Sequence, residues 1–276
     1  MILPNFIIAG APKSATSTLY EYLKQHPDIF MSPVKEPFFF DFNFERGIEY
    51  YAKFFEKYNG ETAIGEATVW YMSWAAVPER IYQTIPDVKL IFILRDPVER
   101  AFSNYLMDLR SGHYTPKQTF GYVIRNEGKV SGIDRRIVSG GFYYRHVKRF
   151  EQYFSRKNML FIVYDDFKSN IREVEKSVYR FLEVDDSFAA ESPPNKMVGE
   201  YIRHQELLIH CSASFPPFNY CWSRSRHFRQ IFLNKSSQRN LINSVDRKYL
   251  LDVYLEENQR LAEYLNVNLD AWCSFS

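Results

Sequence analysis

The stretch FIIAGAPKSATSTLYEYL (6–23) decides the fold of this 276-residue chain. An apolar run ends at Gly10, Lys13 follows three residues later, and small hydroxylated residues then open an amphipathic segment. A buried strand, a tight loop and a helix start together form an anion site, because the N–H groups and dipole of a helix N-terminus attract a phosphate. The stretch therefore predicts a phosphate-binding loop; the alternative is a helix merely capped by serine and threonine.

The loop differs from the one that binds ATP. That loop reads G-x-x-x-x-G-K-[ST], whereas here the second glycine is absent and the lysine comes earlier. The shorter loop still offers backbone N–H groups and hydroxyls to one terminal phosphate, with Lys13 reaching a reactive group beyond it. The residues expected to bind there are Lys13, Ser14, Ala15, Thr16, Ser17 and Thr18.

Strand and helix patterns alternate along the chain. Short apolar runs bounded by turn residues predict buried parallel strands at 5–10, 61–67, 88–95 and 158–167. Helices are expected at about 16–25, 47–57, 75–84, 97–110, 142–155, 170–183 and 246–267. The last of these places Leu250, Leu251, Tyr254, Leu255, Leu261, Tyr264 and Leu265 near one face. The fold class is therefore α/β, with a central parallel β-sheet flanked by helices in three layers.

The domain prediction follows from length and from the absence of a linker. One domain is expected over residues 1–276, with elaborated loops around 110–141 and 189–240. Both stretches are long, and polar or proline-containing, so they are predicted to lack regular secondary structure. Because α/β sheets bind ligands beyond the carboxyl ends of their strands, we expect both loops on the acceptor side of the site.

Composition excludes several function classes. With 35 basic and 33 acidic residues the net charge is +2, so the basic stripe of a nucleic-acid binder is not expected. No stretch approaches the roughly 18 apolar residues of a membrane helix, which predicts no membrane insertion. The three cysteines, Cys211, Cys221 and Cys273, lack zinc-ligand spacing. With no signal-peptide pattern at the N-terminus, a cytoplasmic location is expected. The oligomeric state is left open.

Two further segments carry a family resemblance. SPVKEPFFFD (32–41) and ILRDPVERAFSNYLMDLR (93–110), together with the phosphate loop, resemble sulfotransferases that use 3′-phosphoadenosine 5′-phosphosulfate (PAPS). The likeness is to the heparan-sulfate branch and its bacterial relatives, and continues through GGFYYRHVKRFEQYF (140–154). It implies a P-loop-like fold, PAPS as donor substrate, 3′-phosphoadenosine 5′-phosphate (PAP) as product, and no metal.

The resemblance also implies roles for particular residues. The first loop holds the 5′-phosphosulfate, with Lys13 neutralising charge on the leaving phosphate. The R-x-P…S pattern, here Arg95 and Ser103, holds the 3′-phosphate. Glu36 acts as general base on the acceptor hydroxyl, a role that typically contributes about 10²–10⁴-fold in rate. His113 matches the place of a catalytic histidine in some cytosolic sulfotransferases, with an ordinary loop histidine as the alternative.

The chain departs from the family pattern at three positions. Ala15 replaces the usual glycine, which suits the loop only if this residue keeps φ below zero. Ala67 stands where a lysine near the sulfuryl group is frequent, and the preceding Glu66 is either a second acceptor-side carboxylate or a structural group. Phe38 stands where heparan-type enzymes often carry histidine, so an apolar surface replaces a glycan hydrogen bond.

A late basic loop covers the donor in the heparan-sulfate branch, and its position here depends on how residues are counted. Counting back from the last helix selects Lys235 and Arg239 as donor-binding residues. Counting forward from Cys221 selects Arg224 or Arg226 instead. The sequence leaves the two assignments open.

The acceptor is expected to be a small or medium organic molecule. Near-neutral charge and Phe38 disfavour a polyanionic glycan, and a specialised metabolite of natural product biosynthesis fits better, through a hydroxyl or an amine or amide nitrogen. Two rival functions remain. A P-loop small-molecule kinase would require magnesium and would leave Arg95, Ser103 and Glu36 unexplained. A catalytically silent nucleotide-binding protein is consistent with Ala67.

Overall fold

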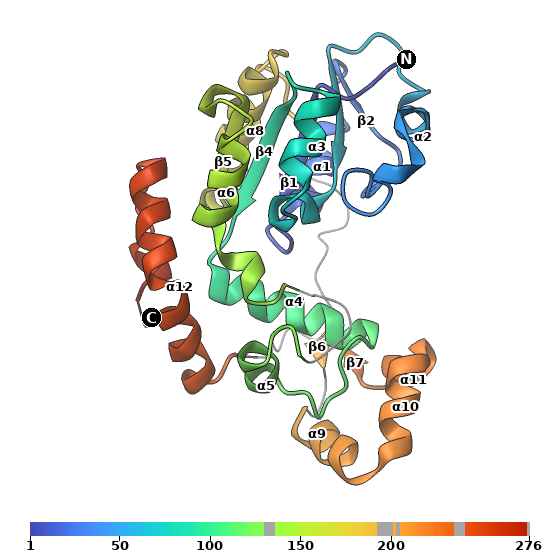
Figure 1. Cartoon of the computed structure of the whole chain (residues 1–276), viewed down its shortest axis with the longest axis vertical. Helices are drawn as coiled ribbons and strands as arrows, with labels where there is room; N and C mark the ends of the chain where they lie inside the picture. The colour runs from blue at the N-terminus through green and yellow to red at the C-terminus, as the bar shows by residue number, and fades with distance from the viewer. Residues whose placement is uncertain (130–135, 192–200, 203–204, 235–240, 275–276) are drawn as a thin grey trace. The chain divides into compact units, whose positions relative to one another are not determined.

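Five parallel strands form the central sheet of the N-terminal part of the chain (Figure 1). They are β1 (Phe6–Gly10), β2 (Ile29–Met31), β3 (Ala63–Ala67), β4 (Lys89–Leu94) and β5 (Met159–Val163), in the order β2-β3-β1-β4-β5. Every neighbouring pair is parallel. The runs are almost wholly apolar because a sheet covered on both faces buries consecutive side chains. The predicted central parallel sheet is confirmed.

β1 occupies the middle of this sheet. Ile8 pairs with Ala67 of β3 on one side and with Ile91 of β4 on the other. After β1 the chain continues into β2 and β3 on one side, and after β3 it crosses to β4 and β5 on the other. Such a change of direction opens a crevice at the carboxyl ends of the strands, where open α/β sheets bind ligands.

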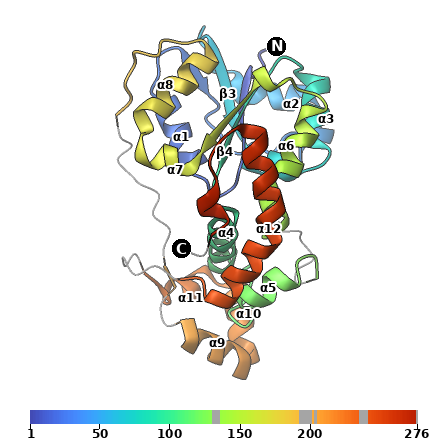
Figure 2. The ribbon, with the colours of Figure 1, turned by 90° about the vertical axis from the view of Figure 1, so that its left-hand side faces the viewer.

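Helices cover both faces of the sheet (Figure 2). One face carries α1 (Thr16–Leu23), α7 (Tyr164–Ser169) and α8 (Ile171–Leu182), and the other carries α3 (Val77–Thr84) and α6 (Tyr143–Glu151). Successive side chains of β4 point to opposite faces of the sheet, so this strand packs against helices on both sides. Ile91 and Ile93 join the core cluster with α1 and α8, whereas the ring of Phe92 contacts Phe150 of α6 at 5.1 Å. The three-layer prediction is confirmed.

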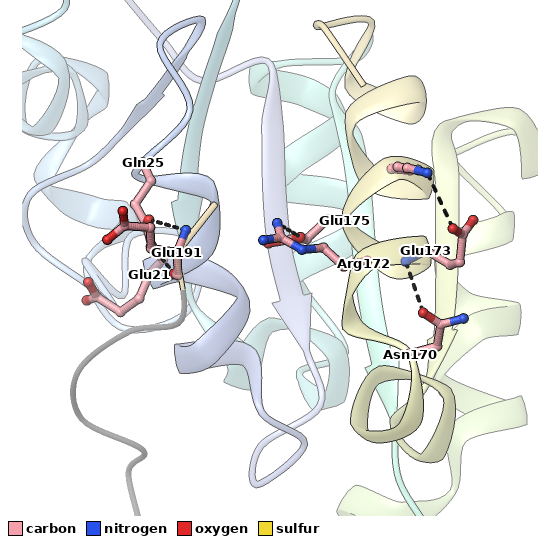
Figure 3. A network of polar contacts seen from close by, with 8 residues as sticks. Glu21, Gln25, Asn170, Arg172, Glu173, Glu175 and Glu191 are labelled. Carbon is pink, nitrogen blue, oxygen red and sulfur yellow. Dashed lines mark hydrogen bonds and ion pairs between the residues drawn. The ribbon is translucent and has the colours of Figure 1, made fainter. Parts of the chain in front are cut away.

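Polar contacts secure the α1 and α8 layer (Figure 3). The side chain of Gln25 donates to the carbonyl of Glu191 at 3.0 Å and accepts from the N–H of Glu191 at 2.9 Å. Asn170 caps α8 by accepting from the backbone N–H of Glu173. The Gln25 contacts tie the chain that follows α8 to the end of α1, and the Asn170 cap stabilises the start of α8.

The structure is a computed structural model that describes the chain except residues 130–135, 192–200, 203–204, 235–240 and 275–276. The described chain divides into two compact units. The first consists of Met1–Asp96, Tyr143–Lys196 and Arg260–Val267, and the second of Pro97–Phe142, Met197–Gln259 and Asn268–Ser276. The expectation of one domain over 1–276 stays a prediction.

The second unit is mainly helical and has its own core. It contains α4 (Pro97–Ser111), α5 (Phe120–Arg125), α9 (Gln205–Ser214), α10 (Pro216–Arg224), α11 (Arg226–Gln230), the antiparallel pair β6 (Tyr201–Ile202) and β7 (Leu233–Asn234), and the first part of α12 (Ser244–Leu265). Trp222 is fully buried, and its indole N–H donates to the carbonyl of Leu109 at 3.0 Å. This bond ties α10 to α4.

Short elements complete both units. They are α2 (Ile48–Ala52), η1 (Phe44–Arg46), η2 (Lys53–Phe55), η3 (Val69–Ser73), η4 (Ser139–Gly141), η5 (Arg156–Asn158) and η6 (Asp270–Trp272). Each is a 3-10 helix except α2. Short 3-10 turns are common as connectors between longer elements.

Four details differ from the sequence prediction. β2 was missed because three residues are too few for a period-2 pattern. Residues 164–167, predicted as strand, belong to α7. The stretch 189–240, predicted to be irregular, contains α9 to α11, with Pro216 at a helix start where its missing N–H costs nothing. Leu255 of α12, predicted on the buried face, is 41% exposed.

Close packing between β1 and β3 depends on Gly65. A Cβ at this position would lie 2.1 Å from Cζ of Phe6, its partner in the register. We expect Gly65→Ala to destabilise the protein by about 1–3 kcal/mol through overpacking. Urea unfolding should show that Phe6→Leu is destabilising alone but stabilising in the Gly65→Ala background. Additive effects of the two substitutions would contradict this account.

Candidate active site

The phosphate loop follows β1 at the carboxyl edge of the sheet. The N–H of Ala11 donates to the carbonyl of Ile93 at 2.9 Å, so the loop starts attached to β4. Lys13 has φ of 67° and Ala15 has φ of 64°, both left-handed. Turns that contain left-handed residues form concave nests of N–H groups that bind anions. The local backbone therefore has the conformation that an anion-binding loop requires.

Ala15 corrects one expectation. The sequence suggested that alanine would suit the loop only at negative φ, yet the residue adopts the left-handed conformation usual for glycine. For an L-residue this costs about 1–2 kcal/mol. The loop thus adopts a conformation usual for glycine at this position and carries the associated backbone strain.

Helix α1 begins directly after this loop with its N-terminus open. No side chain caps it and no acidic residue lies in its first turn. Ser14 is fully buried, and its Oγ has no hydrogen-bond partner in the described part of the chain. Lys13, Ser17 and Thr18 are half-buried. An open helix N-terminus beside an unsatisfied buried hydroxyl and a lysine fits a phosphate-bearing ligand.

Arg95 lies against the same loop. It follows β4, and its Nη1 donates to the carbonyl of Lys13 at 3.1 Å. The Tyr143 hydroxyl donates to the Arg95 carbonyl at 2.9 Å, and the guanidinium lies 5.0 Å from the centre of the Tyr164 ring. The structure therefore brings together Lys13 and Arg95, two cations that the sequence placed at separate phosphates of one ligand.

The segment with Glu36 begins at the same edge of the sheet. Ser32 donates its N–H to the carbonyl of Gly65 at 2.8 Å, and Glu36 donates to the carbonyl of Ala67 at 2.9 Å. The Glu36 side chain is 24% exposed and pairs with Lys35 at 3.4 Å. Glu36 follows β2, but its backbone is attached to the end of β3, which is the direct neighbour of the strand that leads into the phosphate loop.

Phe38 and Phe42 follow Glu36 in the sequence, and Trp74 follows η3. We call these three aromatic side chains the aromatic surface. The rings of Phe38 and Phe42 are 5.9 Å apart, and those of Phe42 and Trp74 are 5.0 Å apart. Phe42 is 63% exposed. Phe38 and Trp74 are half-buried, and a partly exposed aromatic array of this kind is suited to contact the apolar part of a ligand.

Sequence reasoning did not find the buried polar cluster behind this segment. Glu66 is fully buried and accepts from the hydroxyls of Tyr51 at 3.1 Å and Thr68 at 2.8 Å. Burial raises the pKa of Glu66 to about 8, although these hydrogen bonds lower it. Burial likewise raises the pKa of Asp41 to about 6. Glu66 therefore cannot reach an acceptor, which favours a structural role over that of a second acceptor-side carboxylate.

The remaining predicted residues lie elsewhere. Ser103 is half-buried on α4 of the second unit. His113 follows α4 in that unit, with its side chain 42% exposed and Nδ1 3.6 Å from Oδ1 of Asp108. Lys235 and Arg239 fall outside the described residues, and their roles stay predictions. Arg224, from the competing assignment, is exposed.

Neither a membrane-spanning helix nor a metal-binding group is found among the described residues. No helix among them is both long and apolar enough to cross a bilayer. The described chain also brings together no group of three or more His, Cys, Asp or Glu side chains suited to a metal ion. The predictions of no metal and of a cytoplasmic location stay predictions.

Comparison with known proteins identifies the family. The sulfotransferase domain matches residues 3–239, most of the chain. The chain belongs to the sulfotransferase family. This confirms the resemblance to sulfotransferases found in the sequence.

Curated relatives match only part of the chain. A membrane-associated sulfotransferase (kil1) of Dictyostelium discoideum is 44% identical over 47% of this chain and 29% of its own length. A human heparan sulfate glucosamine 3-O-sulfotransferase (3B1) is 30% identical over 58% of this chain and 41% of its own length. The chain thus spans well under half the length of these curated relatives.

One solved structure matches over nearly full length. A sulfotransferase from Alicyclobacillus acidocaldarius superposes with a TM-score of 0.76 and 25% identity, covering 99% of this chain and 100% of its own. A mouse sulfotransferase solved with PAP gives a TM-score of 0.52 at 17% identity, covering 95% of this chain and 88% of its own, and shows the fold alone. The P-loop-like α/β fold of the family is confirmed.

The buried carboxyl of Glu66 predicts a pH-dependent stability. Its pKa is about 8 in the folded protein against an ordinary 4.5, so folding favours the protonated form. This contribution is fully present below pH 4.5 and is lost as pH rises toward 8, by on the order of 4 kcal/mol. Glutamine mimics the neutral acid, so urea unfolding should show that the stability of Glu66→Gln falls much less with rising pH than that of the wild type. An equal slope in both proteins would contradict the assignment.

Proposed function

We propose that this protein transfers the sulfuryl group of PAPS to a hydroxyl of a small or medium organic acceptor. One observation carries the proposal in particular: Arg95 hydrogen-bonds to the phosphate loop at the Lys13 carbonyl, in a chain of the sulfotransferase family. The loop follows the central strand, and its conformation suits an anion. A donor with phosphates at both its 5′ and 3′ positions would meet a cation at each.

The donor end of the site rests on residues 13–18 and Arg95. The open N-terminus of α1 and the unsatisfied Ser14 hydroxyl suit the 5′-phosphosulfate. Arg95, with its planar fork of donors, suits the 3′-phosphate. Ser103 would add a hydroxyl to that phosphate, and Lys235 and Arg239 would cover the donor; all three are carried over from the sequence.

The transfer is an in-line displacement. The acceptor oxygen forms a bond to sulfur, while the bond from sulfur to the bridging oxygen of the 5′-phosphate breaks and leaves its electron pair on that oxygen. Glu36 takes the acceptor proton, and Lys13 neutralises charge on the leaving phosphate. His113 is a second candidate for the base. Positioning and cationic stabilisation carry most of the catalysis, as in phosphoryl transfer.

The aromatic surface supports an apolar acceptor. Phe38 and Phe42 belong to the segment that carries Glu36, Trp74 packs against Phe42, and none of the three offers a charge to a sulfated glycan. A specialised metabolite with an aryl or alkyl alcohol fits this surface, and an amine or amide nitrogen would be activated by the same base. This proposal concerns the acceptor alone and is separate from that of the donor.

Titration with PAP tests the donor site. We expect PAP to bind without magnesium and Arg95→Ala to weaken its binding about 10–100-fold, because a charge-assisted bond to phosphate contributes roughly 1.5–3 kcal/mol. Arg172→Ala, which removes an exposed arginine of α8, is the matched control and should bind PAP as the wild type does. Preference for magnesium-ATP would favour the kinase instead. PAP binding with no turnover on any acceptor would favour the silent binder.

Acceptor kinetics test the aromatic surface. With 2-naphthol as acceptor, we expect Trp74→Ala to raise KM about tenfold while leaving PAP affinity unchanged, since loss of a ring contact removes on the order of 1 kcal/mol. Tyr82→Ala, which removes a 44% exposed ring on α3, should leave KM unchanged. Equal effects of the two substitutions would argue against the aromatic surface as the acceptor site.

A further inference from the structure

The segment that carries Glu36 is held in a strained shape. Glu36 has φ of 60° and Phe38 has φ of 51°. A bulky residue keeps a left-handed conformation only when several surrounding contacts hold it there. Such strained residues cluster at functional sites. Asn43 supplies two such contacts, because its side chain donates to the carbonyl of Pro37 at 3.1 Å and its N–H to the carbonyl of Phe38 at 2.9 Å.

Tyr71 holds the next part of the segment from the buried side. Its hydroxyl accepts from the N–H of Phe39 at 2.9 Å and from the N–H of Phe40 at 3.2 Å. Tyr71 is fully buried on η3, so these amides have no access to water there. The Tyr71 side chain also interacts with the Glu66 carboxyl and lowers the pKa of that group.

Glu66 connects this hydroxyl to the end of β3. Its carboxyl oxygens also accept from Tyr51 and Thr68, so the cluster has a partner for each oxygen. The next residue, Ala67, accepts the N–H of Glu36 itself. The end of one central strand therefore holds the segment both by its backbone and through the Tyr71 hydroxyl.

Arg80 of α3 holds the same segment through its carbonyls. Its Nη1 donates to the carbonyl of Phe40 at 2.9 Å and to that of Asp41 at 3.1 Å. The guanidinium carbon lies 4.7 Å from the centre of the Phe44 ring, which helps to fix its orientation. Phe40 is therefore bound at its N–H by Tyr71 and at its carbonyl by Arg80.

We propose that Tyr71 and Arg80 are positioning residues for Glu36, which hold the backbone of 36–41 so that the carboxylate points at the acceptor. The inference rests on the proposed function, in which Glu36 is the general base. Without the Tyr71 hydroxyl two buried N–H groups lose their acceptor, and the strained segment relaxes. A displacement of about 1 Å at a catalytic group can cost as much as 10²-fold in rate.

Kinetics of Tyr71→Phe test the proposal, with PAPS as donor and 2-naphthol and 2-phenylethanol as acceptors. We expect kcat to fall at least about tenfold while PAP affinity stays within about twofold, because the donor loop is not attached to Tyr71. In the Glu36→Gln background Tyr71→Phe should have no further effect, since a positioning residue acts only through the group that it positions. Tyr179→Phe, which removes an equally buried hydroxyl from α8, is the control and should leave kcat unchanged.

Arg80→Gln is the second variant. Arg80 is half-buried, so this protein should fold even if Tyr71→Phe does not, and PAP binding reports folding in each case. We expect the same loss of kcat at unchanged PAP affinity. Multiplicative losses in the Glu36→Gln background, or unaltered kcat in both variants, would overturn the inference. A wild type that binds no PAP and sulfates neither alcohol would overturn the proposed function instead.

Discussion

Parallel pairing of β1 with β3 on one side and β4 on the other is the constraint on which the site depends. Parallel strands end at a common edge, so the chain segments that leave β1, β3 and β4 must emerge next to one another. The phosphate loop leaves β1, Arg95 follows β4, and the backbone of Glu36 is hydrogen-bonded to the end of β3. Any change in strand order would separate these groups.

The two sides of β1 hold groups of different character. Toward β4, the loop exposes a helix N-terminus to an anion, and Arg95 and Lys13 supply positive charge. Toward β3, the polar groups are buried and satisfied by one another, as with Glu66, whose pKa burial raises to about 8. The cationic side suits a charged donor, and the buried cluster supports the backbone of the segment that carries Glu36.

Aromatic residues make up 17% of the chain, and several of them have a structural role in the same region. Phe39 stacks on Tyr51 with ring centres 4.3 Å apart, and Phe40 contacts Tyr71 at 5.6 Å. These rings bury the segment that follows Glu36 while leaving its backbone groups to hydroxyl and guanidinium partners. Phe42, by contrast, is exposed, so one short sequence supplies both the core and the aromatic surface.

The sequence by itself determined the fold class, the phosphate loop and the family, because these depend on local patterns: an apolar run, a loop of set length and a helix start. It also predicted Lys13 and Arg95 as binding residues for two different phosphates of the donor; the hydrogen bond from Arg95 to the Lys13 carbonyl appears only in the structure. Tertiary structure alone decided the left-handed conformation of Ala15, the burial of Glu66 and the contacts of Tyr71 with Phe39 and Phe40. The Tyr71 contacts, for example, join residues about thirty positions apart that meet only in the folded chain, and no local pattern in the sequence predicts such a contact.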